Sequence, residues 1–263
     1  MLEKDNAIFT EKEGRQMDWD PWPIGWRARI GFIVPSIEPG VMQHEYSHMF
    51  PRGVVMLDTK IMLKTGTPEA FAQMSEEAVY AAELLATSKV DVICYHCAAG
   101  GLINGVAYER GLIKKIEEAS GAKGTTLSLA GLEALKELGV KKIVVANPHV
   151  QALVDAEEKY LLDAGFEVLK TKALDIEDPL EIAARSPWDN YRFVLDLYRE
   201  APDAEAIFIS CGIFRSIEII EYLEKATGKY VVSSASSNAW KCLQLAGIKE
   251  PISGFGSLLA RER

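Results

Sequence analysis

Short apolar runs recur along the chain, and each is only four to six residues long. They are hydrophobic throughout and do not alternate with polar residues, a pattern that favours parallel strands covered on both faces. We predict strands at Ile30–Val34, Val54–Leu57, Val90–Tyr95, Lys142–Ala146, Glu167–Thr171, Ala206–Ser210 and Tyr230–Ser233.

Helical patterns lie between these runs. Thr67-Pro68-Glu69 combines an N-cap residue, a first-turn proline and an acidic first turn, so it predicts a helix that reaches about Ser88. Further helices are predicted at Leu129–Leu138, Val150–Ala164, Trp188–Arg199 and Ser216–Thr227. Strands that alternate with helices predict an α/β fold with parallel sheets.

Three segments recur in the same order, at offsets of about 108 to 114 residues. RIGFIVPS (29–36) matches KKIVVANPH (141–149), and VDVICYHCAAGG (90–101) matches AEAIFISCGIFRS (204–216). SGAKGTTLSLAGLEALKELGV (120–140) matches TGKYVVSSASSNAWKCLQLAGI (227–248). We therefore expect two pseudo-symmetric Rossmann-like lobes with the active site in the cleft between them. The expected divisions are an arm at 1–26, a first lobe of 27–120 plus 230–263, and a second lobe of 121–229.

Composition narrows the class of protein. With 48% hydrophobic and 25% charged residues in 263, the chain is typical of a soluble globular protein with a sizeable core. A net charge of −9 without a Lys/Arg cluster argues against binding to nucleic acid or an anionic membrane. No apolar run approaches the roughly 18 residues of a membrane span. Four cysteines in a chain of this length do not form a disulfide framework, so we expect a cytoplasmic protein with reduced thiols.

The N-terminal arm contains Trp19, Trp22 and Trp26, interleaved with Pro21 and Pro23. Prolines this close forbid a regular helix. We expect the aromatic rings to dock the arm onto the body or onto a second subunit, which predicts a homo-oligomer.

Each repeat has a cysteine directly after a strand. Cys97 precedes Ala98-Ala99-Gly100-Gly101, and Cys211 precedes Gly212. In open α/β sheets ligands bind at the carboxyl ends of strands, and a helix N-terminus there lowers the pKa of a thiol. The pseudo-symmetry predicts that the two thiols face each other across one cleft, although buried cysteines are commonly inert small hydrophobes.

These segments resemble the aspartate/glutamate racemase superfamily, specifically its maleate isomerase and arylmalonate decarboxylase branch. The similarity rests on GFIVPS (31–36), MFPRGV (49–54), the Cys97 segment, APDAEAIFISCG (201–212) and GKYVVSSASSNAWKCLQLAGI (228–248). It covers roughly residues 28–258 and leaves out the arm.

The resemblance implies chemistry without a cofactor or a metal. In racemases of the family one cysteine removes a proton and the other delivers one to the opposite face. In maleate isomerase a thiolate adds to the alkene, which rotates before elimination, and in arylmalonate decarboxylase only the second cysteine acts. Two thiols favour a racemase or an isomerase acting next to the carboxylate of a small acid. The Ser210-Cys211-Gly212 segment resembles the decarboxylase, so decarboxylation of a disubstituted malonate remains an alternative, as does a non-catalytic ligand-binding protein of the same fold.

Substrate-binding candidates follow from the loops and from the family. The first loop contributes Pro35, Ser36 and Glu38, the second-lobe loop contributes His149, and the oxyanion candidates are Ala98, Ala99 and Gly212 with the hydroxyls of Ser128 and Ser234. Glu38 replaces an asparagine of the maleate isomerases, and Asn147-Pro148-His149 and Asp178-Pro179 replace their tyrosine and Asp-Asn pair. Glu38 would repel a carboxylate unless it is protonated or turned away, so we expect a substrate other than maleate.

Three other motifs are less consistent with the surrounding sequence. His44-Glu45-Tyr46-Ser47-His48 matches the HExxH pattern of zinc hydrolases, but prolines flank it closely and no third ligand is evident. Cys94-x-x-Cys97 matches a redox pair, and Cys94, His96 and Cys97 together resemble half of a metal site. We expect Cys94 to point into the sheet packing instead.

Overall fold

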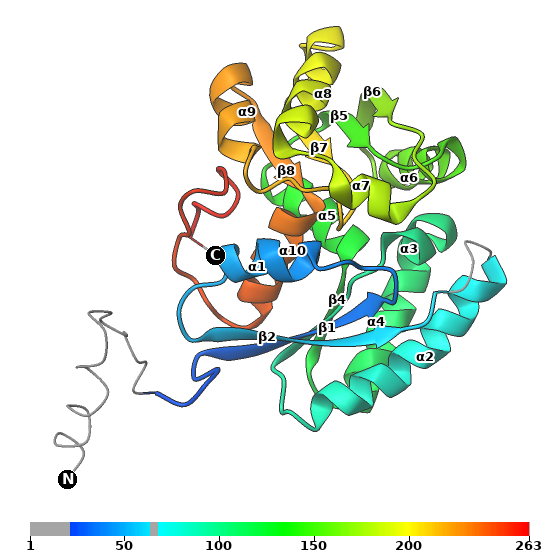
Figure 1. Ribbon diagram of the computed structural model, residues 1–263, viewed down its shortest axis with the longest axis vertical. Helices are drawn as coiled ribbons and strands as arrows, with labels where there is room; N and C mark the ends of the chain where they lie inside the picture. The colour runs from blue at the N-terminus through cyan, green and yellow to red at the C-terminus, as the bar shows by residue number, and fades with distance from the viewer. Residues whose placement is uncertain (1–21, 64–67, 263) are drawn as a thin grey trace, which may run out of the picture.

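The computed structural model describes residues 22–63 and 68–262. Two four-stranded parallel sheets form two lobes, and Figure 1 shows them one above the other. The first sheet has the order β2-β1-β3-β4, with bounds Val54–Ile61, Ala28–Pro35, Val92–Tyr95 and Lys123–Thr126. The second has the order β6-β5-β7-β8, with bounds Glu167–Ala173, Lys142–Asn147, Ala206–Ile209 and Tyr230–Ser233. The identical order confirms the two pseudo-symmetric lobes.

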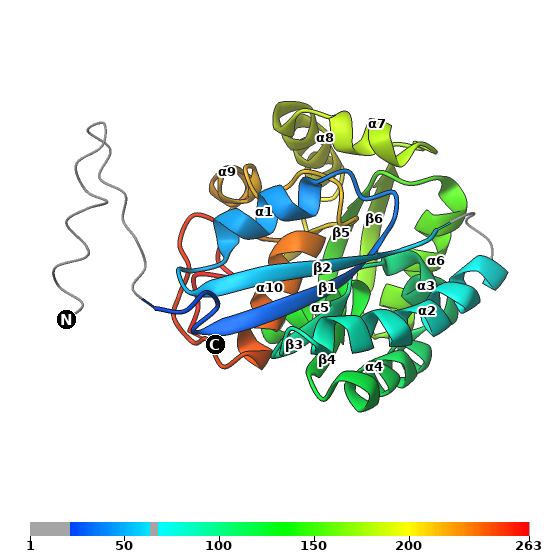
Figure 2. The same cartoon turned by 60° about the horizontal axis from the view of Figure 1, so that its bottom comes forward.

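Helices cover both faces of the sheets, as the apolar strands require. In the first lobe they are α1 (Val41–Met49), α2 (Pro68–Ala86), α3 (Ala98–Asn104) and α4 (Val106–Ser120). In the second they are α6 (Gln151–Asp163), α7 (Pro179–Ala184), α8 (Pro187–Glu200) and α9 (Ile220–Thr227). Figure 2 shows α2 and α4 on the outer face of the first sheet, where they pack against each other.

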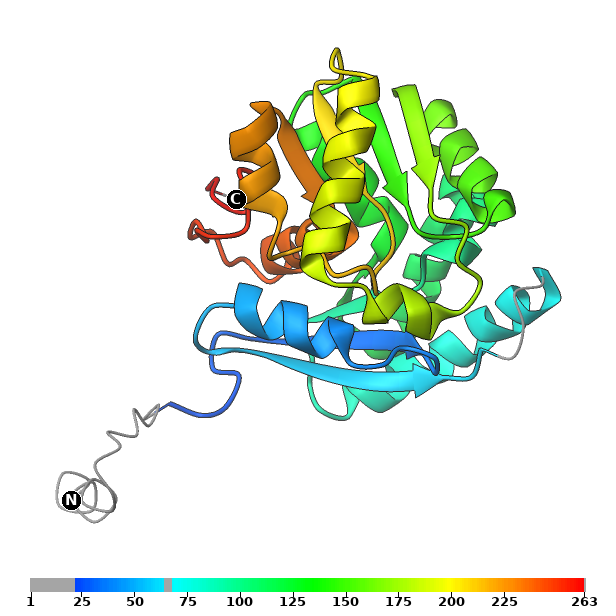
Figure 3. The same ribbon diagram turned by 45° about the horizontal axis from the view of Figure 1, so that its top comes forward.

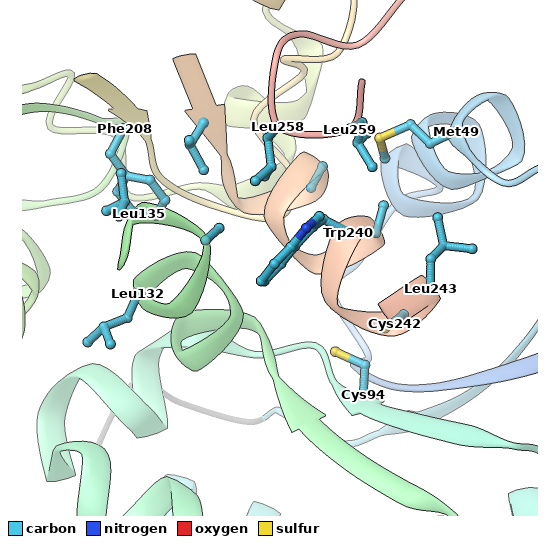
Figure 4. Close-up of a cluster of buried hydrophobic side chains, with 14 of the residues drawn as sticks. Met49, Cys94, Leu132, Leu135, Phe208, Trp240, Cys242, Leu243, Leu258 and Leu259 are labelled. Carbon is cyan, nitrogen blue, oxygen red and sulfur yellow. The ribbon is translucent and has the colours of Figure 1, made fainter. Parts of the chain in front are cut away.

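The chain crosses between the lobes twice, each time directly after a strand. The crossing helices α5 (Leu127–Glu137) and α10 (Ser234–Leu245) pack against each other. Figure 4 shows this central core, in which Leu132 and Leu135 of α5 lie opposite Trp240 of α10. The two lobes therefore share one hydrophobic core.

The expected lobe boundaries differ from the sheet topology by one strand each. Residues 123–126 pair with β3 and belong to the first sheet, although 121–229 was expected to form the second lobe. Residues 230–233 pair with β7 and belong to the second sheet, not to the first lobe. The first difference arises because β4, with the sequence Lys-Gly-Thr-Thr, has too few apolar residues to be recognised as a strand; the second arises because Tyr230–Ser233, although predicted as a strand, was assigned to the other lobe.

Only the end of the predicted arm falls within the described residues, since Trp19 and Pro21 lie outside them. Trp22 and Trp26 are in contact, with ring centroids 5.7 Å apart. The indole of Trp26 also lies directly against Gly53, so the arm meets the body at this tryptophan. No helix among the described residues is long and apolar enough to span a membrane.

Candidate active site

A cavity of about 400 Å³ opens between the lobes, at the carboxyl ends of their strands. The described residues that line it are Pro35, Ile37, Glu38, Leu63, His96, Cys97, Ala98, Ala99, Leu102, Leu127, His149, Leu153, Glu177, Pro179, Cys211, Gly212 and Ile213. Both candidate cysteines are thus in its wall. None of these lining residues is lysine or arginine.

Cys97 lies between β3 and α3, at the N-cap of the helix with extended backbone. The residue as a whole is 7% exposed. Burial raises the pKa of Cys97, while the N–H groups of Gly100 and Ala99 and the hydroxyl of Tyr95 hydrogen-bond to the sulfur and oppose that rise. Hydrogen bonds that favour the thiolate suit a cysteine that acts as a base or nucleophile.

Cys211 follows β7 and has a φ of 83°, in the left-handed region that non-glycine residues rarely adopt. Such strain persists only where the surroundings enforce it and is often found at functional sites. Burial raises the pKa of this thiol to about 12; the N–H groups of Ile213 and Phe214 oppose the rise, while Glu157 and Glu45 add to it. Cys211 is therefore a protonated thiol at neutral pH.

Six of the nine predicted substrate-binding residues lie in the cavity wall: Pro35, Glu38, Ala98, Ala99, His149 and Gly212. Burial lowers the pKa of His149 to about 4, so its imidazole is neutral near pH 7. The residue can therefore donate or accept a hydrogen bond in the cavity wall.

Glu38 also lines the cavity, yet its carboxylate is directed at backbone. One oxygen accepts hydrogen bonds from the N–H groups of Gly40, at 3.0 Å, and Met42, at 2.9 Å. These are the donors at the start of α1 that have no partner within the helix. The carboxylate is thus turned away from a ligand, one of the two conditions under which Glu38 would not repel a substrate carboxylate.

The three predicted serines do not line the cavity. The hydroxyl of Ser36 accepts the N–H of Leu63 at 3.2 Å, and that of Ser128 donates to the carbonyl of Ala98 at 3.2 Å. Ser234 is buried in the first turn of α10. The hydroxyls of Ser36 and Ser128 therefore bind neighbouring backbone, as serine at a strand end commonly does.

Two residues near the cysteines were missed as site residues. His96 lines the cavity beside Cys97, and its Nε2 lies 3.1 Å from the hydroxyl of Tyr46. Glu157 is buried behind Cys211. The sequence around His96 suggested only half of a metal site, while nothing in the sequence around Glu157 points to the site.

The competing motifs do not assemble into sites. The rings of His44 and His48 lie in contact on α1, tilted to each other with centroids 4.6 Å apart, whereas Glu45 is fully buried and binds the loop at Ser216. The glutamate of this segment therefore does not share a face with the histidines. Within residues 22–63 and 68–262 no group of three or more His, Cys, Asp or Glu side chains could hold a metal ion.

Cys94 points away from Cys97, as expected. It accepts a hydrogen bond from the side-chain amide of Asn238 at 2.8 Å, and Figure 4 shows it beside Cys242 in the central core. Cys97 packs in a different apolar cluster on the other face of β3. The two cysteines thus do not form a redox pair.

Comparison with known proteins agrees with this architecture. A maleate isomerase of Pseudomonas putida is 28% identical over 243 residues, which cover 88% of this chain and 97% of that protein. An arylmalonate decarboxylase of Bordetella bronchiseptica is 25% identical over 218 residues, covering 83% of this chain and 90% of that protein. The crystal structure of a maleate isomerase from Pseudomonas putida matches with a TM-score of 0.82 at 25% identity, over 89% of this chain and 98% of that one. The family model described as arylmalonate decarboxylase matches residues 30–259, so the chain belongs to the arylmalonate decarboxylase family.

Proposed function

We propose that this protein is a cofactor-independent isomerase, a racemase or a cis-trans isomerase, that acts next to the carboxylate of a small organic acid. The observation that carries the proposal is the pairing of Cys97 and Cys211 at equivalent strand ends of the two repeats, both in the wall of one cavity. Relatives named maleate isomerase support the reaction class.

Cys97 is the base or nucleophile in this proposal. In racemisation its thiolate takes the α-proton, and the electron pair of the C–H bond moves into the carboxylate to form an enediolate. In cis-trans isomerisation the thiolate instead forms a C–S bond to one alkene carbon, while the C=C π bond breaks and its electron pair moves into the carboxylate to form an enediolate. Elimination after rotation restores the thiolate. The hydroxyl of Tyr95 and two backbone N–H groups stabilise the negative charge on sulfur before and after the step.

Cys211 is the acid. Its S–H bond breaks as a C–H bond forms on the opposite face of the enediolate, which leaves Cys211 as a thiolate. A thiol whose pKa is raised to about 12 by burial stays protonated at neutral pH and is ready to donate. Solvent returns the proton to Cys211 and removes one from Cys97 to complete the cycle.

The cavity favours an acid with an apolar substituent. Leu63, Leu102, Leu127, Leu153 and Ile213 contribute aliphatic surface to its wall. Glu177 lies at the same wall, and no lysine or arginine among the described lining residues would balance a second carboxylate. We therefore propose that the substrate differs from maleate and has one carboxylate near the cysteines, where neutral His149 and backbone groups are the available donors.

Decarboxylation is the second candidate. The apolar wall suits an aryl or alkyl substituent, Gly212 follows Cys211 as in the decarboxylase pattern, and a relative named arylmalonate decarboxylase matches most of the chain. In that reaction the C–C bond to the departing carboxylate breaks, its electron pair forms the enediolate, and Cys211 alone supplies the proton.

The deciding experiment is proton NMR in deuterium oxide with wild type, Cys97→Ser and Cys211→Ser. The panel contains maleate, small amino and hydroxy acids, hydantoins, and aryl or alkyl malonates. Exchange at an α-carbon or formation of a trans alkene that both variants lose supports the isomerase. Loss of carbon dioxide with deuterium uptake that persists in Cys97→Ser but is lost in Cys211→Ser supports the decarboxylase. Binding without turnover supports a ligand-binding protein.

We also propose a homo-oligomer. Trp22, Ile24 and Trp26 remain 62%, 82% and 46% exposed, so this end of the arm offers apolar surface to a second subunit. Light scattering on the full chain and on a Trp22→Ser/Ile24→Ser variant tests it, and an unchanged mass in the variant contradicts the role of the arm.

A further inference from the structure

Each lobe has one buried glutamate on the helix that follows its first strand. Glu45 lies on α1, which follows β1, and Glu157 lies on α6, which follows β5. Their spacing falls within the range that separates the repeated segments, so they are equivalent positions of the duplication. Glu45 is fully buried and Glu157 is 3% exposed. Unpaired carboxyls are rarely buried like this, so each needs a physical reason.

Glu157 binds the beginning of the loop that holds Cys211. Its Oε1 accepts a hydrogen bond from the hydroxyl of Ser210 at 2.6 Å, and its Oε2 accepts one from the side-chain amide of Asn147 at 2.6 Å. Ser210 directly precedes Cys211, and Asn147 ends the neighbouring strand. The carboxyl therefore ties the residue before the thiol to the framework of its own lobe.

Glu45 binds the end of the same loop from the other lobe. Its Oε1 accepts the N–H of Ser216 at 2.7 Å, the hydroxyl of Ser216 at 3.2 Å and the N–H of Ile217 at 3.2 Å. Its Oε2 is buried without a hydrogen-bond partner. Figure 3 shows α1 of the first lobe beneath the second-lobe segments that it contacts.

Between these two anchor points Cys211 has its left-handed backbone. A non-glycine residue is disfavoured in this conformation, so a loop free at both ends would relax it. The anchors hold the strained residue in place. They also bring two carboxyls near one thiol, and negative charge there opposes formation of a second negative charge on sulfur.

Cys97 has a different environment. The hydroxyl of Tyr95 hydrogen-bonds to its sulfur, and the nearby buried carboxyl is that of Glu109, which receives the hydroxyls of Thr126 and Tyr160. The two repeats thus differ in the hydrogen bonds and carboxyl groups around their cysteines, although their strands and sheets correspond.

We propose that Glu45 and Glu157 are positioning residues that anchor both ends of the Cys211 loop and keep the Cys211 thiol protonated for proton donation. The role of Cys211 as the acid rests on the proposed function. The anchoring and its effect on the thiol do not depend on the substrate.

The groups that face the two carboxyls determine whether removing a carboxyl raises or lowers the pKa of Cys211. Glu45 faces Cys211, Tyr46 and Glu218, and Glu218 is itself paired with Arg215 at 2.6 Å and with His44 at 3.4 Å. Glu157 faces Cys211, Ser210 and Asn147. Burial raises the pKa of both glutamates to about 7. Above pH 8 both are carboxylates, so their removal must lower the pKa of Cys211.

The test is the pH-dependent rate of iodoacetamide alkylation, followed at Cys211 and Cys97 by peptide mass spectrometry on the full chain. The variants are Glu45→Gln and Glu157→Gln, with Glu109→Gln as the matched buried control. We expect either of the first two to alkylate Cys211 at least about threefold faster at pH 8.5, which corresponds to a pKa lowered by roughly half a unit. In Glu109→Gln the rate at Cys211 should stay within about a factor of 1.5 of wild type.

Glu157→Asp separates charge from packing because it keeps the carboxylate and shortens the side chain. If charge governs the thiol, Cys211 in this variant should react within about twofold of the wild-type rate. Faster reaction in Glu157→Asp than in Glu157→Gln would show that a loosened loop, not the charge, is responsible, and would overturn the second half of the proposal. Unchanged rates in both Gln variants overturn it entirely.

Two further readouts keep the test decisive. Thermal unfolding shows whether each variant folds. If Glu157→Gln does not fold, Glu45→Gln still tests the proposal, because Glu45 binds the loop from the opposite lobe. If neither variant folds, the alkylation rates of the two cysteines in the wild-type protein decide. The proposal requires Cys211 to be alkylated at least about tenfold more slowly than Cys97 at pH 8.5, and a smaller difference contradicts it. Full activity of Cys211→Ser in the NMR assay would reject the acid role and the proposed function, while the alkylation result would still report on the anchoring.

Discussion

Gly212 lies directly against the imidazole of His96. A Cβ at position 212 would fall 2.6 Å from His96 Cε1 and 3.1 Å from Leu127 Cδ2. His96 follows β3 of the first lobe and Gly212 follows Cys211 in the second, so this contact joins the lobes beside both cysteines. The hydroxyl of Tyr46 holds the imidazole at Nε2 and limits its movement. Glycine after Cys211 therefore has a steric reason in this chain.

We predict that Gly212→Ala lowers activity at least about tenfold and destabilises the protein by about 1–3 kcal/mol, because the methyl group overpacks the contact with His96. His96→Ala in the same chain should recover part of the lost stability, which urea unfolding of the single and double variants measures as a coupling energy. Gly111→Ala is the control, since its added methyl group meets no atom within 4 Å. Additive losses at 212 and 96 would contradict the steric account.

Much of the fold could be predicted because the duplication repeats its apolar strands. In the part of the chain that the structure describes, seven of the eight strands coincide with predicted hydrophobic runs, and the strand order is equivalent in the two sheets. The eighth, β4, has two threonines and a lysine, and only pairing with β3 makes it a strand. Helix α10 begins Ser-Ala-Ser-Ser-Asn, and its capping box between Ser233 and Ser236 is visible only in three dimensions.

The candidate site could be predicted where a reactive residue comes directly after a strand in the sequence. Cys97, Cys211 and the small residues after them reach the cavity because parallel strands bring their carboxyl ends together. The role of Glu45 was not predictable, because its partners at Ser216 and Ile217 lie far away in sequence and in the other lobe. The HExxH spacing suggested zinc, whereas packing turns the glutamate away from the histidines.

Tyr95→Phe tests the hydrogen bond that favours the Cys97 thiolate. Loss of the hydroxyl removes a donor to the sulfur, so the pKa of Cys97 should rise and its alkylation at pH 8 should slow by about threefold to tenfold. Turnover should fall with it if Cys97 is the base. Tyr198→Phe, which removes a hydroxyl near Pro202 far from the cavity, should leave the alkylation rate unchanged. Equal rates in the Tyr95 variant and wild type would exclude this hydrogen bond as the stabilising contact.

Glu38→Ala tests whether the carboxylate serves the helix or the substrate. If it caps α1, its loss should reduce the free energy of unfolding by about 1–2 kcal/mol, because the N–H groups of Gly40 and Met42 lose their acceptor. Urea unfolding measures this change. Glu177→Ala, an exposed carboxylate at the same cavity, should leave the stability within about 0.5 kcal/mol of wild type. Unchanged stability of Glu38→Ala would contradict the capping role and indicate that the carboxylate faces the substrate.

Glu157 should make the protein less stable as the pH rises from about 4.5 to 7. Burial raises its folded-state pKa to about 7 from 4.5, so over this range the unfolded chain releases the proton first and is favoured. Below 4.5 both states are protonated, and above 7 both are ionised, so the difference is constant outside the window. Glu157→Gln removes the titration, and its stability relative to wild type should therefore increase by up to about 3 kcal/mol between pH 4 and pH 8.

Burial lowers the folded-state pKa values of His96 and His149 to about 4, but both histidines are present in both proteins and cancel in the comparison. Glu118→Gln, which changes an exposed carboxylate paired with Lys114, should follow the wild-type curve. Parallel curves for wild type and Glu157→Gln would mean that the buried carboxyl is as easily ionised in the folded protein as in the unfolded chain.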